Sequence, residues 1–306
     1  MFYTQPPMIQ YSIKDLEQLT GIKAHTIRIW EKRYQLIEPE RTSTNIRYYS
    51  DNDLKRLLNV SILNRNGFKI STIVTMNNDE INEHILEISE TSNDSDNQIE
   101  QLIVAMIELD EQRFERVLST SVIKLGFDDT VIKVLYPFFE KIGLLWQIGT
   151  IIPAQEHFVS NLIRQKLIIA IDGQSGNAKT SAYTFLMFLP SNEWHELGLL
   201  FYSYLIKKSG YKVIYLGQSV PFEDLMEVSR KQKIDYLFTS ITTPLTQKKY
   251  ADYIHQLSSV FSSQTIYITG YQTHEYNIEL PSNVKIATNP NEFSDEIKLN
   301  AISKVN

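Results

Sequence analysis

The sequence predicts a multidomain protein: a winged helix-turn-helix domain, a helical bundle, and a doubly wound parallel α/β domain of the Rossmann-like, flavodoxin-like kind. Three observations predict this order. Residues 11–75 combine short helical patterns with a basic, turn-rich insert. Residues 79–171 have helical periodicity and almost no strand signal. After residue 181, continuous apolar and β-branched runs alternate with helix-length segments, which is typical of a parallel sheet covered by helices on both faces.

Turn-forming segments suggest the domain boundaries. We expect the winged helix-turn-helix domain over residues 1–77, a four-helix-bundle cap domain over 78–172 and the α/β domain over 180–306. Residues 172–181 (DGQSGNAKTS) form the clearest linker, and 91–97 (TSNDSDN) a polar break between helices. In the α/β domain we predict strands at 182–189, 211–216, 236–242, 265–269 and 284–288, and helices at 196–209, 222–232, 245–261 and 292–303.

Composition narrows the possible functions. The chain has no cysteine, which excludes disulfides, thiolate metal sites and iron–sulfur clusters. No apolar run reaches the roughly 18 residues of a membrane span, and the N-terminus lacks a secretory pattern, so we expect a cytoplasmic protein without membrane contact. The net charge of −6 is unevenly distributed, since residues 1–75 carry 11 Lys and Arg against 7 Asp and Glu. A basic head on an acidic body suits a protein that touches double-stranded DNA with one end.

The basic head contains a helix-turn-helix pattern. A first helix ends near Gly21, and a second is predicted over residues 24–33. Ile27 and Trp30 are three residues apart and can face the core, where we also expect Tyr49. The side chains left more exposed are Thr26, Arg28 and Arg33. Exposed arginines on a recognition helix can reach phosphates or a guanine edge in the major groove.

The order of these motifs resembles the MerR family. The string 26–34 (TIRIWEKRY), a basic hairpin that ends in Arg47-Tyr48-Tyr49, and a further helix after Ser50 are similar to the MerR-type DNA-binding domain. The resemblance implies a dimer on pseudo-palindromic DNA, with RNA polymerase as a further partner. The DNA-contacting residues that we expect are Thr26, Arg28, Arg33, Arg41, Arg47 and Tyr48.

Two motifs in the rest of the chain indicate a ligand site. Trp146 is followed, across a turn, by Glu156-His157 on the last helical element of the bundle. The segment 193–198 (EWHELG) directly follows the first strand of the α/β domain, and the carboxyl ends of parallel strands are where ligands bind. His195 is a candidate metal ligand, and Glu193 could hold its second ring nitrogen and so set its tautomer.

These motifs resemble the cobalamin-binding family, whose pattern is Asp-x-His-x-x-Gly, then Ser-x-Leu, then Gly-Gly. Here Glu193-x-His195-x-x-Gly198 is followed after 41 residues by Ser240-Ile241-Thr242, and after another 27 by Gly270-Tyr271. With the basic head, the whole chain resembles the light-sensing, adenosylcobalamin-dependent MerR repressors of carotenoid synthesis.

The resemblance implies a role for each motif. The loop histidine would be the lower axial ligand of cobalt, the motif serine would hydrogen-bond the displaced dimethylbenzimidazole tail, and the glycines would leave room for that tail. The helical Trp and Glu would enclose the adenosyl group, and the adjacent His could ligate cobalt after photolysis. Cobalamin would then set the oligomeric state, a homodimer or homotetramer, and the affinity for DNA. The expected cofactor residues are Trp146, Glu156, His157, Glu193, His195, Gly198, Ser240, Thr242, Gly270 and Tyr271, with His195 as the metal ligand.

Three positions depart from the family pattern and leave alternatives open. Glu193 replaces Asp, Thr242 replaces an apolar residue, and Tyr271 replaces the second glycine. A phenol ring at position 271 could fill the space for the tail and block cobalamin, unless it points outward. A second hypothesis therefore keeps the fold but makes the α/β domain a protein-interaction module or a site for another small ligand. A third, a corrinoid-carrying subunit of a mutase or methyltransferase, conflicts with the DNA-binding head, so we expect no enzymatic activity.

Overall fold

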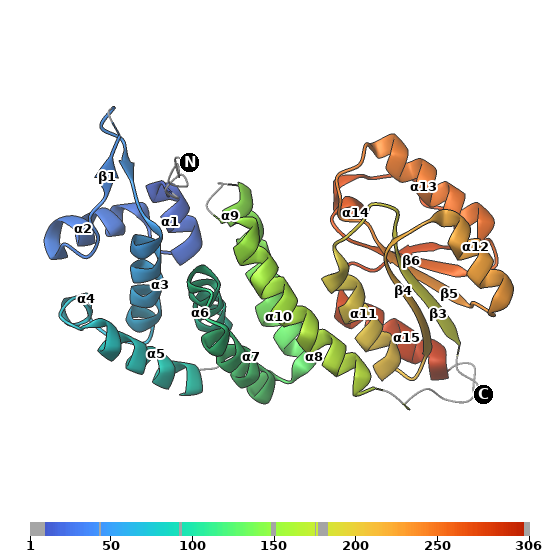
Figure 1. The fold of residues 1–306 in the computed structure, drawn as a ribbon, viewed down its shortest axis with the longest axis horizontal. Coiled ribbons are helices and arrows are strands. Elements are labelled where there is room, and N and C mark those ends of the chain that lie inside the picture. Colours follow the sequence, from blue (N-terminus) through green and yellow to red (C-terminus); the bar gives the residue numbers. More distant parts are fainter. Residues whose placement is uncertain are drawn as a thin grey trace, which may run out of the picture. The chain divides into compact units, whose positions relative to one another are not determined.

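The computed structural model describes residues 10–42, 44–91, 94–147, 151–174, 176 and 183–302. The chain divides into two compact units, Met1–Leu162 and Ile163–Asn306 (Figure 1). Among the residues that the structure describes, no helix is both long enough and apolar enough to cross a membrane.

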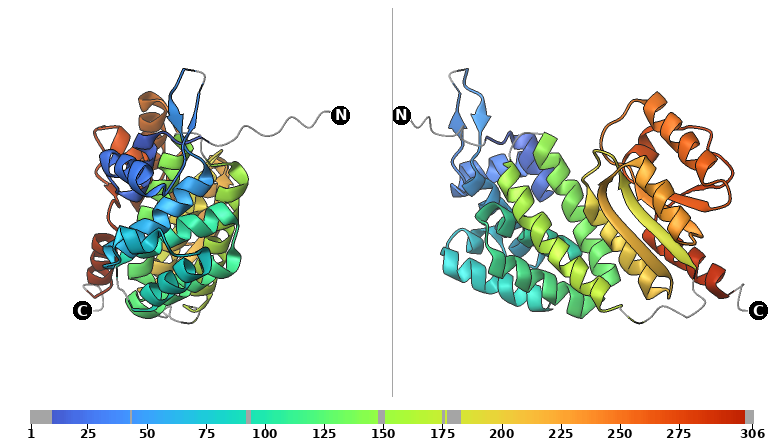
Figure 2. Two further views of the ribbon diagram at one scale, coloured as in Figure 1. Left: turned by 90° about the vertical axis from the view of Figure 1, so that its left-hand side faces the viewer. Right: turned by 45° about the vertical axis from the view of Figure 1, so that its right-hand side comes forward.

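The first unit begins with the predicted winged helix-turn-helix. A capping box at Ser12 and Asp15 begins the first helix, and a second at Ser50 and Asp53 begins the helix after the wing. Figure 2 shows the wing as a two-stranded antiparallel hairpin that projects beyond the helices of the head. The elements are α1 (Ile13–Thr20), α2 (Ala24–Tyr34), β1 (Glu40–Arg41), β2 (Arg47–Tyr48) and α3 (Asp51–Arg65).

Buried aromatic and aliphatic side chains hold the head together. Ile27 and Trp30 of α2 face the interior, and Tyr49 is almost fully buried. The backbones of Tyr11 and Tyr49 exchange two hydrogen bonds of 2.9 Å, which fix the segment before α1 against the end of the wing. The expected core positions of Ile27, Trp30 and Tyr49 are confirmed.

A helical region follows the head. Its elements are α4 (Ile70–Ile73), α5 (Asn78–Thr91), α6 (Ser95–Glu108), α7 (Glu111–Leu125), α8 (Phe127–Thr130), a π-helical turn (Val131–Leu135), α9 (Tyr136–Gln147) and α10 (Pro153–Asp172). The polar break predicted at 91–97 is too long. Thr91 still belongs to α5, and the Asp94 side chain accepts a hydrogen bond from the amide of Asp96, so that α6 already begins at Ser95.

A buried ion pair joins the head to this helical region. The guanidinium of Arg65, at the end of α3, donates to both carboxylate oxygens of Glu100 on α6, at 2.8 and 2.9 Å. It also donates to Asn97 at 2.7 Å and to Ser61 at 2.9 Å. Glu100 is 1% exposed, so these donors replace the water that its carboxylate loses on burial.

The second unit is a doubly wound α/β domain, as predicted. Its five parallel strands have the order β4-β3-β5-β6-β7, which is the flavodoxin-like order (Figure 1). The elements are β3 (Thr184–Pro190), α11 (Glu196–Lys208), β4 (Lys212–Val220), α12 (Phe222–Lys231), β5 (Tyr236–Ser240), α13 (Gln247–Val260), β6 (Thr265–Thr269), α14 (Gln272–Glu275), β7 (Val284–Ile286) and α15 (Pro290–Ile302).

The two faces of this sheet are covered differently. Helices α12 and α13 cover one face with an aliphatic core that includes Leu225 and Ile254 (Figure 1). Helices α11 and α15 cover the other face with packed rings. Tyr202 lies with its ring centroid 4.5 Å from that of Phe238 and 5.2 Å from that of Phe293. Ring packing fills this second face. The strand order reverses between β3 and β5, and in open parallel sheets the carboxyl ends at such a point are where ligands bind.

Candidate functional site

The exposed basic side chains of the head lie on α2 and on the wing. Arg28 and Arg33 of α2 are exposed, as is Arg41 of β1, whereas Thr26 is partly buried. The Arg41 guanidinium donates to the side chain of Asn45 across the wing at 2.7 Å. The expected division of α2 into a buried apolar face and an exposed basic face is therefore present.

Arg47 and Tyr48, the other two residues that we expect to contact DNA, each bond to a carboxylate within the head. Nε of Arg47 lies 3.2 Å from Oε1 of Glu31, and the second oxygen of Glu31 accepts from the Tyr49 hydroxyl at 3.3 Å. The Tyr48 hydroxyl donates to Glu40, and this hydrogen bond raises the pKa of Tyr48. Glu31 thus ties the base of the wing to α2, a role that sequence reasoning missed although Glu31 stands inside the quoted motif.

The loop after β3 is organised around the buried carboxylate of Glu193. Its Oε1 accepts hydrogen bonds from the amides of Trp194 and His195, at 3.0 and 3.1 Å, and lies 2.6 Å from Nδ1 of His195. Its Oε2 accepts from the amides of Thr242 and Thr243, both at 2.7 Å. One side chain therefore joins the loop after β3 to the segment that follows β5.

These contacts fix the charge of Glu193. Burial opposes ionisation of the carboxyl, but the hydrogen bonds from the His195 ring and from the backbone amides of Thr243, Thr242 and His195 outweigh it and lower the pKa of Glu193 to about 2. The ionised carboxylate favours a proton on Nδ1 of His195, which leaves the lone pair of the neutral ring on Nε2. The side chain of His195 is 62% exposed, so Nε2 is the atom of this loop that could ligate a metal.

The motif glycines have different environments. Gly270 has φ 102°, and a Cβ there would lie 2.5 Å from the carbonyl oxygen of Ile241, so the packing of the protein itself requires glycine. A Cβ on Gly198, in the first turn of α11, would meet nothing within 4 Å. The packing therefore does not require glycine at position 198, and Ser240 is buried at the end of β5.

The Tyr271 side chain lies on the surface. It is 61% exposed, and a hydrogen bond with Glu275 raises the pKa of its hydroxyl. The ring therefore points outward, away from the interior of the α/β domain.

The helical candidates lie in the first unit. Trp146, near the end of α9, is 43% exposed. In α10, Nδ1 of His157 lies 3.0 Å from Oε2 of Glu156, whose other oxygen accepts from the Ser160 hydroxyl. The structure thus brings Glu156 to His157 and Glu193 to His195, each pair as a carboxylate beside an imidazole.

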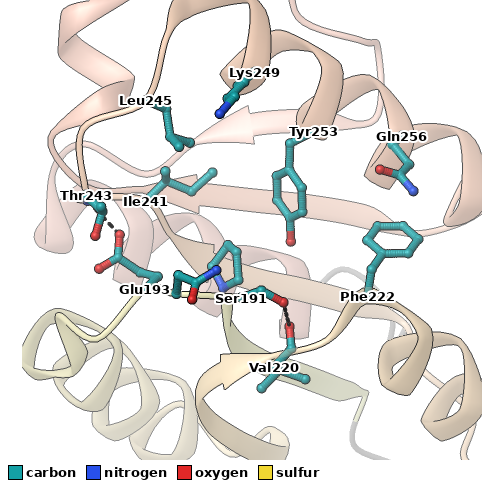
Figure 3. A pocket seen from close by; sticks show the side chains of 12 residues that line it. Ser191, Glu193, Val220, Phe222, Ile241, Thr243, Leu245, Lys249, Tyr253 and Gln256 are labelled. Carbon is teal, nitrogen blue, oxygen red and sulfur yellow. Dashed lines mark hydrogen bonds between the residues drawn. The ribbon is translucent and has the colours of Figure 1, made fainter.

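The sequence analysis did not predict a pocket that is lined by Glu193 but not by His195. It has a volume of about 360 Å³ and lies at the carboxyl ends of β3, β4 and β5, where α13 contributes Lys249 and Tyr253 (Figure 3). Lys249 and Tyr253 are four residues apart on a helix that follows a buried strand, so the sequence alone could have placed them on the same helix face.

A winged helix-turn-helix with exposed arginines, followed by a helical region and a doubly wound α/β domain, is the architecture of a DNA-binding transcription regulator. Comparisons with known proteins narrow this class. Residues 11–79 match the MerR HTH family of regulatory proteins, and residues 98–170 match the B12 binding domain.

Relatives of similar length share most of the chain. The HTH-type transcriptional repressor CarH of Myxococcus xanthus is 27% identical over 81% of this chain and 84% of its own length. The repressor CarA of the same organism is 23% identical over 86% of this chain and 88% of its own length. Among solved structures, the monomethylamine corrinoid protein of Methanosarcina barkeri superposes with a TM-score of 0.49 at 14% identity, over 64% of this chain and 94% of that one.

The chain is therefore a MerR-type transcriptional regulator that carries a B12-binding domain and is homologous to CarH and CarA. The predicted MerR resemblance and the regulatory function are confirmed. The matched B12 domain supports cobalamin binding, and the named relatives are repressors.

Proposed function

We propose that this regulator senses cobalamin, in its adenosyl form, and that the ligand controls its self-association and its affinity for DNA. The observation that carries the proposal is the 2.6 Å contact between buried Glu193 and Nδ1 of His195. A carboxylate on one ring nitrogen is the usual support for a histidine that ligates a metal through the other nitrogen.

The residues of the α/β domain fit the proposed ligand. Nε2 of His195 can serve as a nitrogen ligand of a metal, no protein atom lies beside Gly198 where a Cβ would be, and the Tyr271 ring lies on the surface. When bound, cobalamin would supply a cobalt ion able to take a protein nitrogen as a ligand. We assign His195 as that ligand, and, by the resemblance, we assign Trp146, Glu156 and His157 to the adenosyl group. The resemblance also assigns Gly198, Ser240, Thr242 and Gly270 to the tail.

In this proposal the N-terminal winged helix-turn-helix domain binds DNA. We assign DNA contacts to Thr26, Arg28, Arg33, Arg41, Arg47 and Tyr48, and we propose a homodimer or homotetramer that acts on RNA polymerase in the cytoplasm and catalyses no reaction. A ligand can control such a protein only if it binds the active and inactive states with different affinities.

Reconstitution in darkness tests the cobalamin site. Purified protein is mixed with adenosylcobalamin, desalted and measured by absorbance. We expect the wild type to retain the cofactor, and His195→Ala to shift the cobalt absorption bands and to weaken retention, because the axial imidazole is lost. His255→Ala, an exposed histidine on α13, is the matched control and should behave as the wild type.

Tyr271→Gly completes this experiment. Since the ring is on the surface, the variant should take up as much cobalamin as the wild type. Colourless protein from both the wild type and Tyr271→Gly would contradict the proposal and favour an α/β domain that serves protein interaction or another small ligand.

A further inference from the structure

The pocket beside Glu193 has the walls of a small-molecule site. Phe222, at the start of α12, and Tyr253 of α13 meet edge to face, with ring centroids 6.2 Å apart and an interplanar angle of 84°. Ile241 and Leu245 supply aliphatic walls between these rings and the end of β5 (Figure 3). The volume of about 360 Å³ lies in the range of ligand pockets, and the walls suit a flat apolar body.

The Tyr253 hydroxyl and the Lys249 ammonium group make no hydrogen bond or ion pair with the residues that the structure describes. The Tyr253 hydroxyl points into the pocket, and burial raises its pKa, so the group stays protonated and can donate (Figure 3). Lys249 is the one cation of the lining, and no carboxylate in the described ranges lies within ion-pair distance of its Nζ. Lys249 also lies in the first turn of α13, where the helix dipole favours a negative group.

The single carboxylate of the lining does not compete for this cation. Both oxygens of Glu193 already accept hydrogen bonds, Oε2 from the amides of Thr242 and Thr243 at 2.7 Å. Lys249 therefore calls for one negative group in the pocket, and the Tyr253 hydroxyl for one acceptor.

The residues that line this pocket differ from those proposed to bind cobalamin. It includes none of His195, Gly198, Ser240, Gly270 and Tyr271, which the resemblance assigns to the cofactor. Only Glu193 belongs to both.

We propose that this pocket is a second ligand site, for a small aromatic monoanion such as a carboxylate or sulfonate. Its ring system would lie between Phe222, Tyr253 and Leu245, and its negative group would bind Lys249. Through Thr243 and Glu193, the ligand would contact the same hydrogen-bonded segment that orients His195. The site gives the regulator an effector other than cobalamin, so it goes beyond the function proposed above.

A fluorescent aromatic sulfonate, 1-anilinonaphthalene-8-sulfonate, is a suitable probe. It is titrated into the full-length, cobalamin-free protein, so that the result does not depend on cobalamin binding. We expect one saturable site. Lys249→Gln should raise the dissociation constant about 5- to 10-fold, because a charge-assisted contact is lost. Lys248→Gln, the neighbour on the same helix that is likewise exposed but lies outside the lining, should change it less than about 2-fold.

Two further measurements complete the test. Leu245→Trp fills the pocket and should abolish saturable binding, and circular dichroism reports whether this variant folds. Protein loaded with adenosylcobalamin should bind the probe as the free protein does. Equal affinities of the wild type, Lys249→Gln and Lys248→Gln would overturn the proposal. Displacement of the probe by cobalamin would also overturn it, since the pocket would then belong to the cofactor site.

Discussion

Glu193 shows how one added methylene is accommodated. Where the cobalamin-binding pattern has Asp, the longer Glu side chain still reaches Nδ1 of His195 at 2.6 Å, as expected, and its other oxygen reaches the amides after β5. Five donors, four of them backbone amides, converge on one buried carboxylate. The rigid backbone, rather than other mobile side chains, therefore fixes the position and tautomer that we propose for His195.

The low pKa of Glu193 has a consequence for stability. The pKa of about 2 in the folded protein lies below the ordinary value of 4.5, so folding favours the ionised form. The resulting stabilisation, on the order of 3 kcal/mol, is complete above the unfolded pKa and declines as the pH falls toward the folded pKa. Glu193→Gln removes it. We expect the difference in unfolding free energy between wild type and Glu193→Gln to be about 1–1.5 kcal/mol smaller at pH 3.5 than at pH 7.

Urea unfolding followed by tryptophan fluorescence measures this difference at both pH values. Glu223→Gln, at an exposed position of the same unit in the first turn of α12, is a control whose effect should be small at both. A destabilisation by Glu193→Gln that does not change between pH 7 and pH 3.5 would show that the carboxylate is not preferentially ionised in the folded state.

At the residue scale, the sequence predicted burial better than it predicted partners. Helical spacing was enough to place Ile27 and Trp30 in the core, because the 3.6-residue period alone decides which face is buried. The partners of Arg47 and of Glu193 depend on contacts between segments 16 and about 50 residues apart, which no local period encodes. By contrast, the contact of Tyr271 with Glu275 joins residues four apart, a spacing that the sequence does show.

At the scale of elements, α2 and the wing form the expected basic surface. We expect Arg28→Ala and Arg47→Ala each to weaken binding to a DNA duplex selected with the wild type by about 1–3 kcal/mol if a base edge is read. If a phosphate is held instead, the loss should be similar for unrelated sequences, and the salt dependence of binding should become shallower. Arg230→Ala on α12, an exposed arginine of the other unit, is the control.

Fluorescence anisotropy at several salt concentrations separates these two cases. Affinities of both variants that equal the wild type at every salt concentration would contradict their assignment as DNA contacts. Arg28 is the more informative of the two, because Glu31 holds the Arg47 guanidinium and Arg47→Ala also loosens the base of the wing.

The contact between α3 and α6 gives a second prediction at this scale. Burial raises the pKa of Glu100, and the Arg65 guanidinium opposes that shift. Arg65→Ala leaves the buried carboxylate without its cation, and we expect a loss of about 2–3 kcal/mol in unfolding free energy. Replacing both partners, in Arg65→Met with Glu100→Met, should recover much of this loss because no buried charge remains.

A matched control lies on the same pair of helices. Lys55 of α3 pairs with Glu108 of α6 at 3.3 Å near the surface, and Lys55→Ala should cost less than about 1 kcal/mol. Thermal unfolding of the variants gives these values. Equal losses for Arg65→Ala and Lys55→Ala would show that burial does not strengthen the inner pair.

Sequence patterns located the elements well but not all of their ends. The five predicted strands exist, because strands buried on both faces are continuous apolar runs. However, β4 extends to Val220 through a polar stretch with an irregularity at Gly217, which an edge strand tolerates on its exposed side. Helix α15 begins at Pro290, earlier than predicted, because the Asn289 side chain accepts a hydrogen bond from the amide of Asn291.

At the scale of the whole molecule, the basic surface of the head lies in the first compact unit, and His195, the proposed metal ligand, lies in the second. Coupling between them requires that cobalamin favour one state of the protein, whether that state differs in oligomer size or in the accessibility of the head. Charge does not follow the boundary between the units. Residues 1–75 carry 11 Lys and Arg against 7 Asp and Glu, residues 163–306 carry 14 against 13, and the acidic excess of the chain lies in residues 76–162.

The affinity for DNA with and without adenosylcobalamin tests this account most directly. Binding to the selected duplex is measured in darkness, with the mass of the protein followed in parallel by sedimentation. We predict that saturating adenosylcobalamin changes the DNA affinity by roughly 5- to 150-fold, the range typical of coupled sites, together with a change in mass. Protein that retains the cofactor after desalting, yet has the same DNA affinity and the same mass with and without it, would contradict the account.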